Sequence, residues 1–245
     1  MKFSLLLASL APLAMALPAG SLVARSCPAN ALSCSSNAGD SCCSPTNGIL
    51  ILVQQWVPGY GPSDAFTMHG LWPDTCNGGQ TGSTGCDSTR SYSNVGSIIQ
   101  SYNSTLYDNM NTYWPSDAGA NTNFWTHEWD KHGTCVSTLA PKCYANYQQY
   151  EDVNDYFSTA LGLRAQYDLY NALSTAGITP GSSTDIGTFS QALQTAFGVV
   201  PKVDCSSGTL SEVWLYFNVQ NTNTFVPIDA IGSNTCTGSV NYPTK

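Results

Sequence analysis

Positive charge is scarce in this chain. Its 245 residues include 8 Lys and Arg against 16 Asp and Glu, a formal net charge of −8 at pH 7 with histidine neutral. Non-specific binding to nucleic acid depends on Lys and Arg, so this balance, taken alone, argues against a nucleic-acid partner. It leaves open an enzyme that holds one phosphate with a local cationic cluster, most readily at acidic pH, where histidines gain charge.

Long apolar runs are absent beyond the N-terminus. Residues 3–16 are apolar, follow Lys2 and end in Ala14-Met15-Ala16, which is the pattern of a cleaved signal peptide. Residues 17–25 are then a possible pro-segment. Residues 26–245 are expected to form one soluble, extracellular domain with no membrane contact.

The motifs of several enzyme classes are missing. The chain has no Cys-x-x-Cys pair, which disfavours a zinc site built on cysteines, and no Gly-x-Ser-x-Gly or glycine-rich phosphate loop. Ten cysteines in an exported chain instead predict a disulfide framework that could use all of them in five bridges. The adjacent Cys42 and Cys43 must bridge in two directions. Cys86 is expected to pin the Gly- and Ser-rich loop over residues 77–93.

The spacing of apolar residues predicts an α+β domain. Strands are expected over residues 49–56, 66–71, 212–219 and 225–228, and helices over residues 98–114, 144–161, 164–176 and 185–197. Thr184 or Asp185 is expected to cap the last helix, and Gly198 to end it. Because these strands and helices do not alternate regularly, the expected fold is a central antiparallel sheet packed with several helices, in a single disulfide-stabilised domain.

Histidine is also scarce, and its placement carries the functional signal. His69, His127 and His132 are the only histidines, and they lie in two short segments, residues 69–73 and 127–133. Histidine is the side chain best suited to moving protons near neutral and mildly acidic pH. We therefore interpret the three histidines as residues that take part in a reaction. The alternative is that all three are buried and only make structural hydrogen bonds.

A helix through the second segment would place its polar side chains together. At about 100° per residue, four of them span about 140° of one face: His127, Lys131, Glu128 and His132. Trp129 points away from this face and could anchor the helix in the core, while Cys135 could fasten the chain just after Gly133. Such a face could move a proton and offer positive charge to an anion.

A zinc site is the alternative for the same residues. His127-Glu128 begins like the His-Glu-x-x-His motif, which needs histidines four residues apart so that both reach one metal. Here the gap is five residues, and Lys131 would lie beside the cation. The spacing therefore favours proton transfer without a metal.

Two segments resemble the signatures of the ribonuclease T2 family, most closely those of fungal secreted acid ribonucleases. Residues 66–73 read FTMHGLWP, and residues 124–135 read FWTHEWDKHGTC. Two long signatures in this order are highly specific. The N-terminal signal, the cysteine count and the mature length also fit, so the resemblance covers nearly the whole mature chain.

The resemblance implies an endoribonuclease that needs neither metal nor cofactor and cleaves single-stranded RNA with low base specificity. It implies a 2′,3′-cyclic phosphate intermediate and a 3′-phosphate product, with His132 as the base for the 2′-hydroxyl and His69 as the acid for the leaving 5′-oxygen. These roles would reverse when water opens the cyclic phosphate. Glu128 and Lys131 would stabilise the phosphorane, and His127 would hold the phosphate.

Base recognition has several candidates. Trp72 could stack on a base, and Asp74 could accept a hydrogen bond from an exocyclic amine, although Trp72 could instead belong to the core and Asp74 to a turn. Similar proteins also use a tyrosine a few residues after this aspartate, which residues 75–80 lack. The candidates for a second base pocket are Gln55, Pro115 and Phe124.

Two functions from other classes stay open at this point. One is a non-catalytic binding or defence protein on the same scaffold, and the other is a secreted zinc hydrolase.

Asn103-Ser104-Thr105 is a sequon for N-glycosylation. No feature of the sequence indicates an oligomer, so a monomer is expected.

Overall fold

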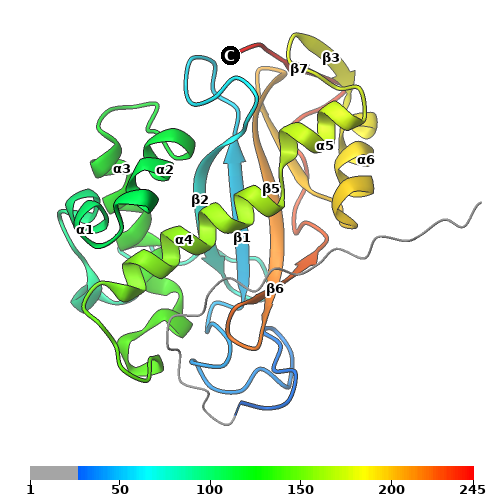
Figure 1. The fold of residues 1–245 in the computed structure, drawn as a ribbon. Helices are drawn as coiled ribbons and strands as arrows, with labels where there is room; N and C mark the ends of the chain where they lie inside the picture. The colour runs from blue at the N-terminus through cyan, green and yellow to red at the C-terminus, as the bar shows by residue number, and fades with distance from the viewer. Residues whose placement is uncertain (1–26) are drawn as a thin grey trace, which may run out of the picture.

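The computed structural model describes residues 27–245, so the expected signal peptide and pro-segment lie outside the described residues. This range forms one seven-stranded sheet with six α-helices around it (Figure 1). The strands are β1 (Ile49–Gln55), β2 (Thr67–Asp74), β3 (Ser182–Asp185), β4 (Lys202–Ser206), β5 (Thr209–Gln220), β6 (Thr224–Ile228) and β7 (Ser239–Tyr242). The helices are α1 (Val95–Tyr102), α2 (Ser104–Tyr113), α3 (Asn121–Lys131), α4 (Glu151–Gln166), α5 (Leu169–Thr175) and α6 (Ile186–Phe197).

The sheet is almost entirely antiparallel, as predicted. Its strand order is β2-β1-β5-β7-β3, and β4 and β6 also pair with β5. The short β5–β7 contact is the parallel one. Every residue of β1 is buried, which explains why its sequence is a continuous apolar run rather than an alternating one.

The two faces of the sheet have different neighbours. On one face, Leu50 and Leu52 of β1 join a large core that includes Val153 and Phe157 of α4. Figure 1 shows α4 crossing in front of the sheet, with α1, α2 and α3 grouped on one side of it and α5 and α6 on the other. On the opposite face, Ile51 belongs to a small cluster against which Trp72 packs. The site described below lies at the border of this second face and α3.

The prediction of a single helix over residues 98–114 is wrong, because the structure has two helices there, α1 and α2. The chain breaks at Asn103, whose φ of −152° and ψ of 86° are not helical. The Asn103 side chain accepts a hydrogen bond from the backbone N–H of Leu106 and so caps α2. Asparagine is among the best N-cap residues, and this local hydrogen bond outweighs the apolar periodicity that runs through it.

The boundaries of the next helices also differ from the prediction. The helix α4 begins at Glu151 rather than at Tyr144, because Tyr150 takes a left-handed conformation with φ 71°. It continues through Gly162, and the next helix begins after Asp168, whose carboxylate caps it. The cap of α6 by Asp185 and its end at Gly198 are confirmed. The strands β3, β4 and β7 were not expected, since each is only four or five residues long.

Five disulfides use all ten cysteines, as predicted. They join Cys27–Cys43, Cys34–Cys76, Cys42–Cys143, Cys86–Cys135 and Cys205–Cys236. The neighbours Cys42 and Cys43 do bridge in two directions. The Cys86–Cys135 bridge ties the loop before α1 to the turn that follows α3.

None of the helices within residues 27–245 has the length and apolar character needed to cross a membrane.

Removing the Cys86–Cys135 bridge by a double replacement with alanine is expected to lower the free energy of unfolding by about 4 kcal/mol. The bridge closes a loop with a sequence separation of 49, and the constraint on the unfolded chain grows with loop length. The matched control is the Cys27–Cys43 bridge, with a separation of 16 and an expected loss of about 3 kcal/mol. Urea unfolding measures both, and the reverse ranking would contradict this account.

Candidate active site

His69 lies on β2 at an irregularity in the sheet. Opposite Val53 the register pairs Gly70, but opposite Gln54 it pairs Met68, so His69 is the extra residue of a bulge. Bulges commonly turn one side chain out of the regular alternation. The backbone carbonyl of His69 accepts a hydrogen bond of 2.9 Å from Trp114 Nε1, which fixes the bulge against α2.

Two buried tryptophans fix the orientation of α3. Trp125 Nε1 donates to the carbonyl of Trp114 at 2.8 Å, and Trp129 Nε1 donates to the carbonyl of Arg90 at 2.6 Å. Both indoles are fully buried, so the predicted anchoring by Trp129 is confirmed. Because these residues are four apart, they hold one side of the helix in the core and turn the polar face toward β2.

Glu128 is the most deeply placed polar group on this face, with 1% of its surface exposed. Its carboxyl accepts a hydrogen bond of 2.9 Å from Trp72 Nε1. Gly70 lies against both groups, and a Cβ there would overlap Glu128 Oε2 and Trp72 Nε1. Burial raises the pKa of Glu128 to about 7, against the opposing effects of His69, Trp72 and Lys131. At mildly acidic pH this carboxyl is therefore protonated and can donate a hydrogen bond.

His132 ends α3 and is 7% exposed. Its ring stacks on Trp72, with ring centroids 5.2 Å apart and planes 23° from parallel. Its Nδ1 atom is buried and has no hydrogen-bond partner among the described residues. Burial lowers the pKa of His132 to about 3, and the positive charge of Lys131 adds to this. The imidazole is therefore neutral at mildly acidic pH and can accept a proton.

His69 has the opposite electrostatic environment. Burial acts to lower its pKa, but a hydrogen bond from Nδ1 to Glu212 Oε1 and the negative charge of Glu212 outweigh this, so the pKa of His69 is raised above its ordinary value. Trp72 lies between the two histidines, since its ring meets His69 edge-on at 4.8 Å and stacks on His132. The site thus pairs an imidazole that favours its protonated form with one that favours its neutral form.

His127 and Lys131 complete the predicted polar face. The His127 side chain is exposed, and its ring centroid lies 6.2 Å from that of His132. Burial, together with Lys131, lowers the pKa of His127. The structure therefore brings together all four polar residues predicted from the helical spacing.

Glu128 and the two histidines of this segment could also approach one metal ion. The ligand atoms of His127, Glu128 and His132 lie within 4.8 Å of one another. The five-residue spacing of the two histidines therefore does not by itself exclude a metal ion, because His132 is buried beside Glu128 at the end of the helix. The charge of Lys131 opposes a cation at this place, since it lowers the pKa of both histidines.

The residues predicted to contact bases are divided between two places. Gln55 and Phe124 line a cavity of about 340 Å³ that also borders His69 and Glu212, whereas Pro115 is not among its lining residues. Asp74 lies at the other end of β2 and is 8% exposed. Trp72 contacts Glu128, His69 and His132, which the prediction did not include.

Glu212 and Trp214 are the residues that sequence reasoning missed. They lie on β5, where a strand was expected over residues 212–219, and neither is near a recognisable motif. A usable signal was present, because the chain has only three glutamates and one of them stands in this strand.

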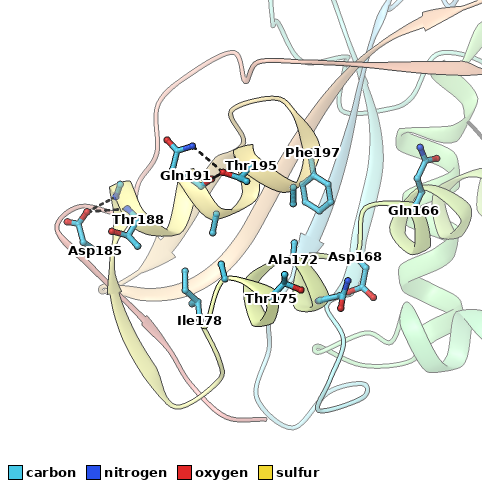
Figure 2. Close-up of a pocket in the computed structure, with 15 residues that line it drawn as sticks. Gln166, Asp168, Ala172, Thr175, Ile178, Asp185, Thr188, Gln191, Thr195 and Phe197 are labelled. Carbon is cyan, nitrogen blue, oxygen red and sulfur yellow. Dashed lines mark hydrogen bonds between the residues drawn. The ribbon is translucent and has the colours of Figure 1, made fainter. Parts of the chain in front are cut away.

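A cavity of about 1040 Å³ lies between α5 and α6, away from the three histidines (Figure 2). Its two carboxylates, on Asp168 and Asp185, cap the helices that form it. No histidine, lysine or arginine lines it, so the histidine site remains the candidate for chemistry.

The fold and this geometry define an α+β protein with a histidine-based site between a sheet and a helix. Residues 34–236 match the model of the ribonuclease T2 family, and the chain belongs to that family. It is 53% identical to ribonuclease Rh of Rhizopus niveus over 236 residues, which are 96% of this chain and 99% of that protein. It is 38% identical to ribonuclease T2 of Aspergillus oryzae, over 95% and 89% of the two chains.

The structural comparison agrees. The crystal structure of Actibind, a T2 ribonuclease, matches with a TM-score of 0.83 and 40% identity, over 88% of this chain and 96% of that one. The resemblance seen in the two signature segments is confirmed, including its fungal character.

Proposed function

We propose that this protein is a secreted endoribonuclease that cleaves single-stranded RNA with low base specificity and without a metal or cofactor. The observation that carries the proposal is the pair of histidines on either side of Trp72, one with a raised pKa and one with a lowered pKa. The 2′-hydroxyl of RNA supplies an internal nucleophile, so such a pair suffices for cleavage.

In the first step His132, neutral at mildly acidic pH, takes the proton of the 2′-hydroxyl. The 2′-oxygen attacks the phosphorus, and protonated His69 gives its proton to the leaving 5′-oxygen. The product is a 2′,3′-cyclic phosphate. In the second step the roles reverse. His69, now neutral, takes a proton from water, and the water oxygen attacks the phosphorus. The bond from phosphorus to the 2′-oxygen breaks, His132 gives its proton to that oxygen, and a 3′-phosphate results.

The other polar groups stabilise the phosphorane. Protonated Glu128 can donate a hydrogen bond to a phosphate oxygen, and Lys131 supplies positive charge where negative charge develops. His127, more exposed at the rim, holds the phosphate. The net charge of −8 fits weak, local binding of one phosphodiester and an acidic working pH.

Five disulfides support an oxidising, extracellular compartment, consistent with the expected signal peptide. We further propose that the protein acts as a monomer, as expected from the sequence.

Replacing His69 with Ala or His132 with Phe is expected to lower the rate of RNA cleavage roughly 10²–10⁴-fold, the usual size of a general acid or base contribution. The wild-type protein should keep full activity in EDTA and release a 2′,3′-cyclic phosphate. Circular dichroism checks that both variants fold. Near-normal cleavage by either folded variant would refute the assignment, and a metal requirement would revive the zinc interpretation.

Asp74→Asn is expected to change base preference in a pH-dependent way. Burial raises the pKa of Asp74 to about 6, so the carboxylate that accepts from an exocyclic amine becomes more populated as pH rises through 6. The wild type should therefore favour amine-bearing bases more at pH 7 than at pH 5, and the variant should not. Cleavage of a dinucleotide series measures this, with Asp108→Asn, on the exposed side of α2, as the control. An unchanged preference in Asp74→Asn would exclude this role.

A further inference from the structure

Glu212 joins the acid histidine to the centre of the sheet. Its Oε1 atom contacts His69 Nδ1, and its Oε2 atom accepts a hydrogen bond of 2.8 Å from Trp214 Nε1. Both carboxylate oxygens are therefore engaged, one by the histidine and one by the indole. A carboxylate held at both oxygens has little freedom to rotate.

The frame around Glu212 is rigid. In the sheet, Glu212 pairs with Gln55 of β1 on one side and with Asp204 of β4 on the other. Trp214 is held in turn, because Lys202 Nζ lies 3.8 Å from its ring centroid and its ring meets that of Trp72 edge-on at 5.1 Å. Lys202 also pairs with Asp204 at 2.7 Å. Glu212 thus stands on a central strand, where positions are set more firmly than on a loop.

We propose that Glu212 is a positioning residue for His69 in the RNA cleavage proposed above. By accepting the hydrogen bond from Nδ1–H, it fixes the orientation of the imidazole and leaves Nε2 to carry the proton that goes to the leaving oxygen. It also stabilises the protonated ring, so that His69 is an acid at the pH where His132 is a base. The inference rests on the proposed function and assigns a further residue to it.

The other charged groups that face His69 act at longer range. They are Glu128 from α3 and Asp117 from the segment between α2 and α3, which favour the charged imidazole, and His127 and His132, which oppose it when protonated. Burial holds Glu128 protonated in mildly acidic solution, and Asp117 is exposed and screened by solvent. Trp72 and Phe124, which also contact the His69 ring, are uncharged. Glu212 is therefore the carboxylate in a position to control His69.

Titration of the wild-type protein by NMR tests this without any change to Glu212. The chain has three histidines, so single replacements assign the three imidazole signals. We expect His69 to titrate above the ordinary value of 6.5, with its Nδ1 proton retained, and His127 and His132 to titrate below it. Titration of His69 below 6.5 would overturn the proposal, even if every Glu212 variant failed to fold.

Glu212→Gln keeps a hydrogen-bond acceptor near Nδ1 but removes the charge. We expect the His69 titration, and the alkaline limb of kcat against pH, to move down by about one pH unit. Above that limb kcat should fall roughly ten- to hundredfold, and KM should change less than kcat, because the lost contact orients and charges His69 for proton transfer. The matched control is Asp204→Asn, which neutralises the carboxylate paired with Glu212 across the sheet and should leave both titrations in place.

The outcomes separate this inference from the proposed function. If the wild type does not cleave RNA, or if His69→Ala cleaves it normally, the proposed function fails. If the wild type cleaves RNA through His69 but Glu212→Gln keeps the wild-type His69 titration and alkaline limb, the function stands and the role of Glu212 is refuted. A shift of equal size in Asp204→Asn would also refute it, because any nearby negative charge would then suffice.

Discussion

The hydrogen bond from Trp72 Nε1 to Glu128 is the interaction on which the site depends, because it joins the strand that carries one histidine to the helix that carries the other two. The same indole stacks on His132 and meets His69 edge-on. Gly70 permits this contact, since a side chain there would overlap both hydrogen-bonded groups. One aromatic ring thus sets the separation and orientation of the proposed acid and base.

Burial gives these groups their different protonation states. Removing a charged group from water costs free energy, so burial raises the pKa of a carboxyl and lowers that of an imidazole. Glu128 and His132 follow this rule, with pKa values of about 7 and about 3. His69 departs from it because the carboxylate of Glu212 is in direct contact. A protonated acid and a neutral base can therefore coexist in a chain whose net charge is strongly negative.

Much of the fold and of the candidate site could be predicted from the sequence, wherever the signal depends on residues that are close together in the chain. The apolar run of residues 49–55, the Asp185 cap and the polar face of residues 127–132 depend on neighbours in the chain, and each was predicted. The break at Asn103 was missed because one capping hydrogen bond outweighed a long periodic pattern. Glu212 was missed for another reason: it lies 143 residues from His69, and only the pairing of β5 with β1 brings the two together.

The pH dependence of kcat/KM for a dinucleoside phosphate, measured in EDTA, tests the central claim most directly, since it reports the titrating groups of the free enzyme. The account predicts activity that rises through about pH 3 as His132 loses its proton and stays high in mildly acidic solution. It predicts that kcat/KM falls above pH 6.5 as His69 deprotonates. The loss of the Glu128 proton near pH 7 should lower kcat/KM further. A rising limb near pH 6.5 with a maximum in alkaline solution would contradict it.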